Sequence, residues 1–148
     1  MIAGVALAGC GSFESKPKLV IINVLDKEYY DDCHIADSKQ AWSINVPFLE
    51  IDEYAQKNLD KESEIVLYCS NYKCSASGAA ARRLAKMGFK KVYAFEGGMA
   101  EWKQLGYPTK GSCQMPYLTQ VVPKPDEAEP LVISAQELHQ KMQEHAKV

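Results

Sequence analysis

The sequence predicts an α/β domain whose mostly parallel sheet is covered by helices on both faces. Short apolar runs flanked by polar residues, Leu19–Val24, Ile65–Tyr68 and Val92–Phe95, are typical of buried parallel strands. The segments between these runs carry apolar residues at helical spacing, so strand and helix alternate. With 148 residues, 47% of them hydrophobic, the chain is long enough to bury the core of one such domain.

The chain begins with an apolar, uncharged run that ends at Cys10. Leu7-Ala8-Gly9-Cys10 resembles the lipobox of bacterial lipoproteins, in which the cysteine is lipidated and becomes the mature N-terminus. The run is too short to span a bilayer, although no Lys or Arg precedes it as in most secretory signals. We expect residues 1–9 to be the remnant of a lipoprotein signal, Cys10 to be the lipidation site and residues 10–17 to form a tether. The alternative is a buried N-terminal strand.

The first predicted strand is followed by a short exposed helix, a histidine and a longer helix. Glu28–Asp32 forms the short helix, and His34, which comes next but one, is expected to make structural hydrogen bonds rather than to act in catalysis. Pro47–Leu59 carries apolar residues on one helical face. Asp60–Ser63 is the turn that leads into the next strand.

The second buried strand, Ile65–Tyr68, ends at Cys69, and apolar residues then recur at helical spacing from Ala76 to Met87. Cys69 is therefore predicted at the carboxyl end of a strand, in a loop that abuts a helix N-terminus. The free N–H groups and dipole of that helix end, together with Lys73, favour a thiolate. Cys69 is the candidate nucleophile. The alternative, a small buried residue that ends a strand, is equally compatible with the residues alone.

The third strand, Val92–Phe95, leads through a Gly97-Gly98 turn into a helix over Met99–Leu105, with Trp102 facing the core. Beyond Gly111 the composition changes.

Residues 112–130 are rich in proline and acidic residues and are predicted to be an extended linker. Residues 131–148 offer a short strand and a helix that starts with a capping box, Ser134 with Glu137. An amphipathic helix needs a surface to cover, so we expect this extension to supply a missing sheet edge, either on its own chain or on a partner in a homodimer. The other explanation is the start of a lost second repeat.

Three ordered segments between about Leu19 and Gly111 resemble the rhodanese family of sulfurtransferases. The first segment, Asn23–Ile35, is a strand, a short helix and a His-Ile element, and Ser43–Pro47 follows it. The second segment is the loop Cys69–Cys74 after the Ile65–Tyr68 strand, and the third is the C-terminal signature Gly88–Pro108. The resemblance implies a rhodanese-like domain over residues 18–111, with a central five-stranded sheet and helices on both faces.

The resemblance also implies an activity. Cys69 would carry a persulfide and move a sulfane sulfur from thiosulfate or polysulfide to a thiophilic acceptor such as cyanide, a thiol or a protein cysteine. The loop that binds these small sulfur-containing anions would comprise Ser70, Asn71, Tyr72, Lys73, Cys74 and Ser75. No cofactor and no metal is expected. Cys74 departs from the family, which often has arginine at this position to hold anionic donors such as thiosulfate.

Other functions remain open at this stage. Related phosphatases use a cysteine, five residues and an arginine, but Ser75 stands at the arginine position. A sulfur carrier or a redox-responsive binding module using Cys69 and Cys74 is the main alternative to an enzyme, and a purely structural domain is another.

Four cysteines besides Cys10 allow three pairings. Cys33 with Cys113 would leave the active loop free, whereas Cys69 with Cys74 would close a ring across it and suggests a self-resolving persulfide. We expect a lipid-anchored protein of the bacterial envelope, facing the periplasm, or otherwise a cytoplasmic one.

The net charge of −2 provides no basic field for nucleic acid, so we expect none to bind. His139 and His145 are six residues apart, which does not place them on one helical face as a metal pair. Contact with the membrane is expected through the lipid anchor alone.

Overall fold

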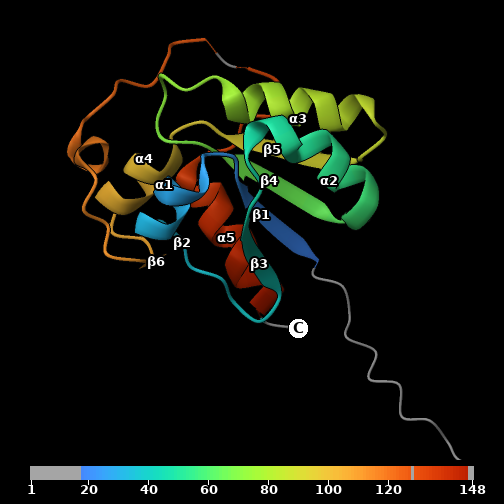
Figure 1. The fold of residues 1–148 in the computed structure, drawn as a ribbon, viewed down its shortest axis with the longest axis horizontal. Helices are drawn as coiled ribbons and strands as arrows, with labels where there is room; N and C mark the ends of the chain where they lie inside the picture. The colour runs from blue at the N-terminus through green and yellow to red at the C-terminus, as the bar shows by residue number, and fades with distance from the viewer. Residues whose placement is uncertain (1–17, 128, 147–148) are drawn as a thin grey trace, which may run out of the picture.

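The computed structural model describes residues 18–127 and 129–146, and its centre is a parallel sheet of four strands (Figure 1). The strands are β1 (Leu19–Asn23), β3 (Ala41–Asn45), β4 (Glu64–Tyr68) and β5 (Lys91–Phe95), in the order β3-β1-β4-β5. A smaller antiparallel pair joins β2 (His34–Ile35) to β6 (Thr109–Lys110). The predicted α/β class with a mostly parallel sheet is confirmed.

Every residue of β1 is buried, because both faces of the sheet are covered. Leu19 and Ile21 belong to one hydrophobic cluster, and Val20 and Ile22 belong to a second cluster on the opposite face. This alternation follows from the two-residue period of a strand. The central strands are therefore fixed in register by burial on both sides.

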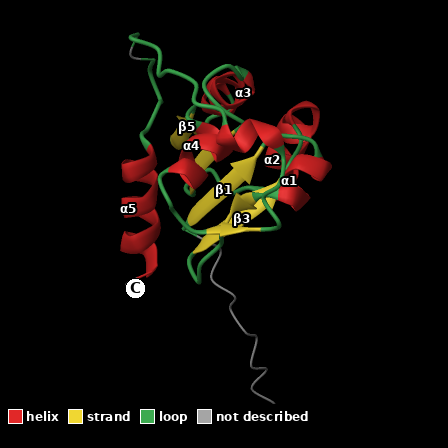
Figure 2. Ribbon diagram, turned by 90° about the vertical axis from the view of Figure 1, so that its left-hand side faces the viewer, coloured by secondary structure: helices red, strands yellow, loops and turns green. Residues whose placement is uncertain are grey.

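Helices from both halves of the chain cover the two faces. The η1 turn (Phe48–Glu50), α2 (Ile51–Asn58) and α3 (Ala76–Lys86) pack on the face of Val20 and Ile22. The opposite face is covered by α4 (Gly98–Gln104) and α5 (Ala135–Ala146), and Figure 2 shows α5 running beside the sheet. Two short elements, α1 (Lys27–Asp32) and η2 (Pro116–Thr119), lie at the edge of this second layer. As predicted, Trp102 is fully buried.

The prediction of five strands needs correction. The main sheet has four strands, and next to β5 the C-terminal segment contributes one parallel bridge, between Ala94 and Val132. Two main-chain bonds flank it: Ala94 N–H donates to Leu131 O (2.8 Å) and Ile133 N–H donates to Ala94 O (3.0 Å). Leu131 has a φ of +71°, so the chain leaves the extended conformation before Val132 and a longer ladder cannot form.

The C-terminal extension packs on its own chain, as one of the alternatives predicted. Leu138 is fully buried, and Ile133 and Met142 join the same hydrophobic cluster. Lys141 forms an ion pair with Glu64 at the start of β4. The predicted capping box is present, because Glu137 N–H donates to Ser134 Oγ while Ser134 N–H donates to the Glu137 carboxylate. A homodimer through this extension stays a prediction.

The segment predicted as an extended linker is packed in its first part. Leu118 of η2 is buried, and the Gln104 side-chain amide donates to the carbonyls of Leu118 (3.0 Å) and Gln120 (2.9 Å). In Figure 1 the chain then passes around the edge near α4 before it returns to α5. The prolines therefore mark an irregular segment, but not one that is free of the domain.

A disulfide joins Cys33, at the end of α1, to Cys113. The neighbouring Asp32 carboxylate accepts the backbone N–H groups of Gln114 (3.0 Å) and Met115 (3.1 Å). The Gln114 bond is the main cause that lowers the pKa of Asp32. This junction ties the chain after β6 to α1. Cys33 belongs to the hydrophobic cluster of Leu19 and Ile21, whereas Cys69 belongs to the cluster on the opposite face of the sheet.

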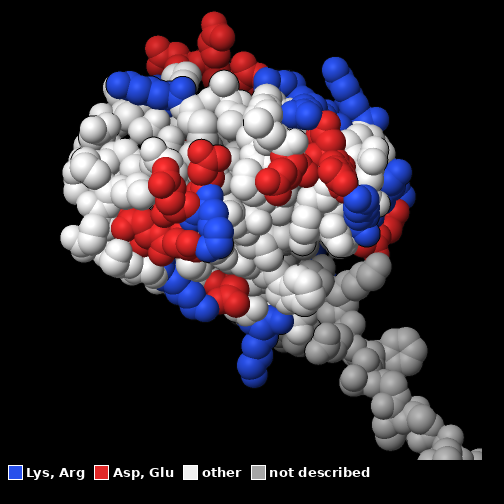
Figure 3. Space-filling view, viewed as in Figure 1, with Lys and Arg blue, Asp and Glu red and all other residues white. Residues whose placement is uncertain are grey.

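Charged side chains of both signs are interspersed on the face shown in Figure 3. Within the described ranges, no helix is both long and apolar enough to cross a membrane. Cys10 and the tether lie outside the described residues, so the predicted lipidation stays a prediction.

Candidate active site

Cys69 lies where the sequence predicts it, directly after β4 at the carboxyl end of the sheet. The loop of residues 69–75 leads from there into α3, whose N-cap is Ser75. The Cys69 side chain is only 1% exposed and belongs to the hydrophobic cluster under α2 and α3. Strand, cysteine, loop and helix therefore follow one another in the predicted arrangement.

The start of α3 faces this loop, and the first N–H groups of an α-helix have no partner within the helix. Ser75 makes no capping hydrogen bond with its side chain, so it leaves the first N–H groups of the helix free of that partner. The helix contains Ser77, Gly78 and Ala80 as buried residues, whose small size lets it approach the sheet closely. A negatively charged sulfur in the loop would be stabilised by these N–H groups and by the helix dipole.

The start of α4 supports the other side of the loop. Met99 N–H donates to Cys69 O (2.9 Å), and Ala100 N–H donates to Ser70 O (3.0 Å). Gly98 has a φ of +67°, and a Cβ added there would lie 2.6 Å from Cys69 O. The Gly97-Gly98 turn therefore contacts the main chain of the loop directly, which was not predicted from the sequence.

Asn71 gives the loop its turn. Its carbonyl accepts Cys74 N–H and its side-chain oxygen accepts Lys73 N–H, both at 3.0 Å. This turn brings Cys74 back toward Cys69, with 6.3 Å between the Cα atoms, and the two cysteines form a disulfide. The chain therefore has both of the pairings that the sequence analysis considered, in one molecule.

The remaining predicted loop residues differ in exposure. Ser70 Oγ is 3.9 Å from Cys69 Sγ, whereas the side chains of Lys73 and Ser75 are exposed. The structure brings all of them into one short loop around Cys69. It does not assign a function to any of them, so their roles in binding stay predictions.

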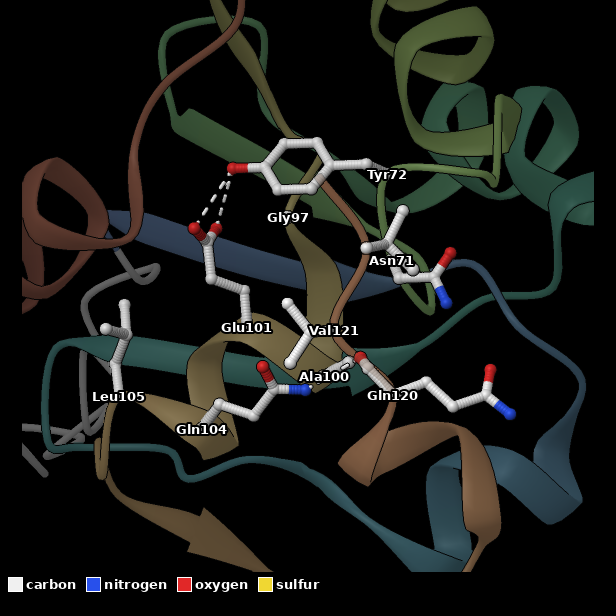
Figure 4. A pocket seen from close by; sticks show the side chains of 10 residues that line it. Asn71, Tyr72, Gly97, Ala100, Glu101, Gln104, Leu105, Gln120 and Val121 are labelled. Carbon is white, nitrogen blue, oxygen red and sulfur yellow. Dashed lines mark hydrogen bonds between the residues drawn. The ribbon is translucent and has the colours of Figure 1, made fainter. Parts of the chain in front are cut away.

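Tyr72 reaches away from the loop to α4 (Figure 4). Its hydroxyl donates to the Glu101 carboxylate, at 3.0 and 2.9 Å from the two oxygens. Burial and the adjacent Glu101 carboxylate both raise the pKa of Tyr72, so the phenol is neutral at physiological pH. The contact with Glu101 could not be predicted from the sequence, because no local pattern links this residue to the loop far upstream.

A cavity of about 190 Å³ opens beside this contact (Figure 4). Its lining joins the loop to α4 and to the segment after η2: Asn71, Tyr72, Gly97, Ala100, Glu101, Gln104, Leu105, Gln120, Val121 and Val122. Cys69 does not line it. This cavity could not be predicted from the sequence, because it depends on the packing of a segment that was expected to be a linker.

His34 has the structural role predicted for it. Its ring stacks on Tyr30 with centroids 3.9 Å apart, and its Nδ1 lies 2.8 Å from Tyr30 O. Within residues 18–127 and 129–146, no group of three His, Cys, Asp or Glu side chains is arranged to hold a metal ion. The expectation of a reaction without metal or cofactor stays a prediction.

Comparisons with known proteins agree on one family. The family model of the rhodanese-like domain matches residues 12–105. The crystal structure of a Bacillus halodurans protein is similar, with a TM-score of 0.55 and 31% identity over 65% of this chain and 66% of that one. The solution structure of the rhodanese-like domain of an Anabaena protein has a TM-score of 0.55 and 27% identity, over 77% of this chain and 83% of that one.

A rhodanese-related protein from Thermoplasma volcanium has a TM-score of 0.53 and 26% identity, over 63% of this chain and 84% of that one. The match to the Bacillus protein spans just under two thirds of that protein's length. No curated protein matched the chain.

Proposed function

Because this chain belongs to the family of rhodanese-like domains, we propose that it is a sulfurtransferase that works through a persulfide on Cys69. The observation that carries the proposal is the position of Cys69, directly after β4 and in the loop that leads to the N-terminus of α3. A thiolate there is stabilised as an anion and is therefore available as a nucleophile.

The reaction has two displacements. In the first, the Cys69 thiolate attacks the outer sulfur of thiosulfate or polysulfide, and sulfite or a shorter polysulfide leaves. In the second, an acceptor such as cyanide, a small thiol or a protein cysteine takes this sulfur and releases the Cys69 thiolate. The N–H groups of the loop that Asn71 does not engage, together with the N-terminus of α3, stabilise the charge that develops on sulfur in both steps. Lys73, exposed in the same loop, attracts an anionic donor.

The first displacement requires a free Cys69 thiol. The Cys69–Cys74 disulfide must therefore be reduced before the loop can take up sulfur. Two loop contacts do not involve the side chains of these cysteines, namely the Asn71 turn and the bond from Met99 N–H to Cys69 O. They support a loop that keeps its backbone path when the disulfide opens.

The test is sulfur uptake by the reduced protein. Reduced Cys74→Ser and Cys69→Ser are incubated with thiosulfate or polysulfide, freed of donor, and measured by intact mass. A gain of one sulfur atom in Cys74→Ser, absent from Cys69→Ser, is expected. The two variants are matched, because each keeps one loop cysteine and neither can form the loop disulfide. No gain in Cys74→Ser with any donor would rule out the activity.

A second candidate function is favoured by the Cys69–Cys74 disulfide itself. A sulfur carrier or redox-responsive binding module would use the two cysteines to report oxidation without turnover. It predicts that reducing the loop disulfide changes the affinity for a protein partner, measured with the oxidised and the reduced chain side by side. Equal affinities would leave the enzyme as the better explanation.

For location, we propose the periplasmic side of a bacterial envelope with a lipid anchor at Cys10. The Cys33–Cys113 disulfide supports this proposal, because structural disulfides persist in oxidising compartments. Metabolic labelling with a fatty-acid analogue, comparing wild type with Cys10→Ala, tests it. An unlabelled wild type would contradict it.

A further inference from the structure

We infer that Cys74 is a resolving thiol that expels the sulfur carried by Cys69 as sulfide. The products are then hydrosulfide and the Cys69–Cys74 disulfide. The electrons that reduce the sulfane sulfur therefore come from the two cysteines of the loop. This inference rests on the proposed persulfide at Cys69. It identifies the disulfide as a stage of the reaction cycle rather than a structural bond.

The backbone of the loop places the two cysteines for this step. Their Cα atoms are 6.3 Å apart, which is within the range that a disulfide spans. The bond from Cys74 N–H to Asn71 O fixes the return of the chain, and Asn71 is itself 92% buried, with its side chain engaged to Lys73 N–H. Cys74 is therefore held within reach of Cys69 by contacts that are independent of the sulfur atoms.

Burial favours an attacker that is already inside the loop. Cys69 is 1% exposed, so an external thiol has less access to Cys69 Sγ than to the outer sulfur of a persulfide on it. Cys74 is partly buried against the same hydrophobic cluster and needs no approach from solvent. An intramolecular thiol held at the reacting distance has a large advantage in effective concentration over one that must diffuse in.

The chemistry balances within the loop. The Cys74 thiolate attacks Cys69 Sγ, a bond forms between the two Sγ atoms, and the bond from Cys69 Sγ to the sulfane sulfur breaks. The electron pair of that bond leaves with the sulfane sulfur, which departs as hydrosulfide with its own proton. The sulfane sulfur gains two electrons, and the two cysteines together lose two. Hydrosulfide is a weaker base than an ordinary cysteine thiolate, so it can leave in this step.

The cycle then needs a dithiol reductant, which supplies two electrons and two protons to reopen the loop. Cys74 is the more exposed of the two cysteines, so we expect the reductant to attack Cys74 Sγ. This attack forms the mixed disulfide on Cys74 and releases Cys69 as the thiolate next to the N-terminus of α3. The partner implied is therefore a protein or small molecule with two adjacent thiols.

The test separates loading from resolution. Reduced wild type, Cys74→Ser and Cys69→Ser, freed of reductant, receive thiosulfate or glutathione persulfide, whichever loads Cys74→Ser. Neither donor releases sulfide when it gives up its outer sulfur, so sulfide measures the resolving step. Trypsin cleaves after Lys73, so that residues 62–73 and 74–82 stay together only through a Cys69–Cys74 disulfide. The linked peptides distinguish this bond from the Cys33–Cys113 bond.

We expect the wild type to release about one equivalent of sulfide and to yield the linked peptides. Cys74→Ser should retain its persulfide with a lifetime at least about tenfold longer and release no sulfide above Cys69→Ser. A wild-type persulfide that lasts as long as that of Cys74→Ser would overturn the resolving role and leave the sulfurtransferase intact. If neither of these donors loads Cys74→Ser, and polysulfide does not load it either by intact mass, the proposed function fails and the inference fails with it.

Discussion

Replacing Gly98 by alanine should disable the active loop from a distance, because this glycine lies against the main chain of Cys69 and Ser70. An added Cβ would be 2.6 Å from Cys69 O, 2.7 Å from Ser70 C and 2.8 Å from Ser70 O. All three are backbone atoms, so no side chain can turn away to make room. Either the start of α4 or the first two loop residues must move.

The structure offers a matched control in Gly106. Gly106 has a φ of +78°, close to the +67° of Gly98, but an added Cβ there would have no atom within 4 Å. Both substitutions carry the backbone cost of an alanine in the left-handed region, about 1–2 kcal/mol. Gly98→Ala adds an overpacking cost of about 1–3 kcal/mol. We therefore expect a loss of about 2–5 kcal/mol for Gly98→Ala and about 1–2 kcal/mol for Gly106→Ala.

Two measurements test this difference. Urea unfolding of the oxidised proteins, at unchanged m-value, gives the two stabilities. Sulfur uptake by the reduced, folded proteins gives the effect on Cys69, and a displacement of about 1 Å would slow it roughly a hundredfold in Gly98→Ala alone. Equal stability losses and equal uptake rates in the two variants would show that the contact between Gly98 and the loop does not position Cys69.

Three further changes have expected outcomes. Removing the disulfide through Cys33→Ser with Cys113→Ser should cost about 4.5 kcal/mol in urea unfolding, because the bond closes a loop with a sequence separation of 80. Leu138→Ala, at a fully buried position of α5, should cost about 2–5 kcal/mol in the same assay. Asp32→Asn should destabilise the protein at neutral pH and progressively less in acid. The folded pKa of Asp32 is lowered, so its contribution is present above the unfolded pKa and is lost as the pH falls through the folded pKa.

Each of these predictions has a control. The double variant of Cys33 and Cys113 is compared with wild type under conditions that keep Cys69–Cys74 oxidised. A loss of only about 2 kcal/mol, the value expected for a disulfide between residues five apart, would contradict the loop-length argument. Gln136→Ala, exposed on α5, should change stability by less than about 0.5 kcal/mol. For Asp32, a stability difference that does not change with pH, measured beside Asp126→Asn, would contradict the role of its hydrogen bonds.

Local patterns were enough to predict the centre of the fold and the position of Cys69 between a strand and a helix. The apolar run before Cys69 and the helical spacing after Ala76 reflect burial along one short segment, and both predictions are confirmed. The capping box of Ser134 and Glu137 spans a single turn and is also present. These features depend on neighbours in the sequence, so a single sequence contains the information.

Features that join distant segments could not be predicted in the same way. The approach of Gly98 to Cys69 depends on how α4 packs against the loop, and a glycine pair in sequence signals only a turn. The cysteine pairing was one of three possibilities until the fold brought Cys33 to Cys113. The prolines after Gly111 predicted a free linker, but the burial of Leu118 is decided by a surface formed elsewhere in the chain.

The position of α5 has a consequence for the order in which the domain can form. β1 ends at Asn23, while the helix that helps cover one of its faces begins at Ala135. Leu19 and Ile21 therefore emerge early, from the ribosome or from a translocation channel, and lack this part of their cover until α5 has also emerged. In that interval α4 alone covers the face, and part of it stays open to other unfolded chains. A delay in the emergence of α5 would lengthen the period in which this apolar surface can lead to aggregation.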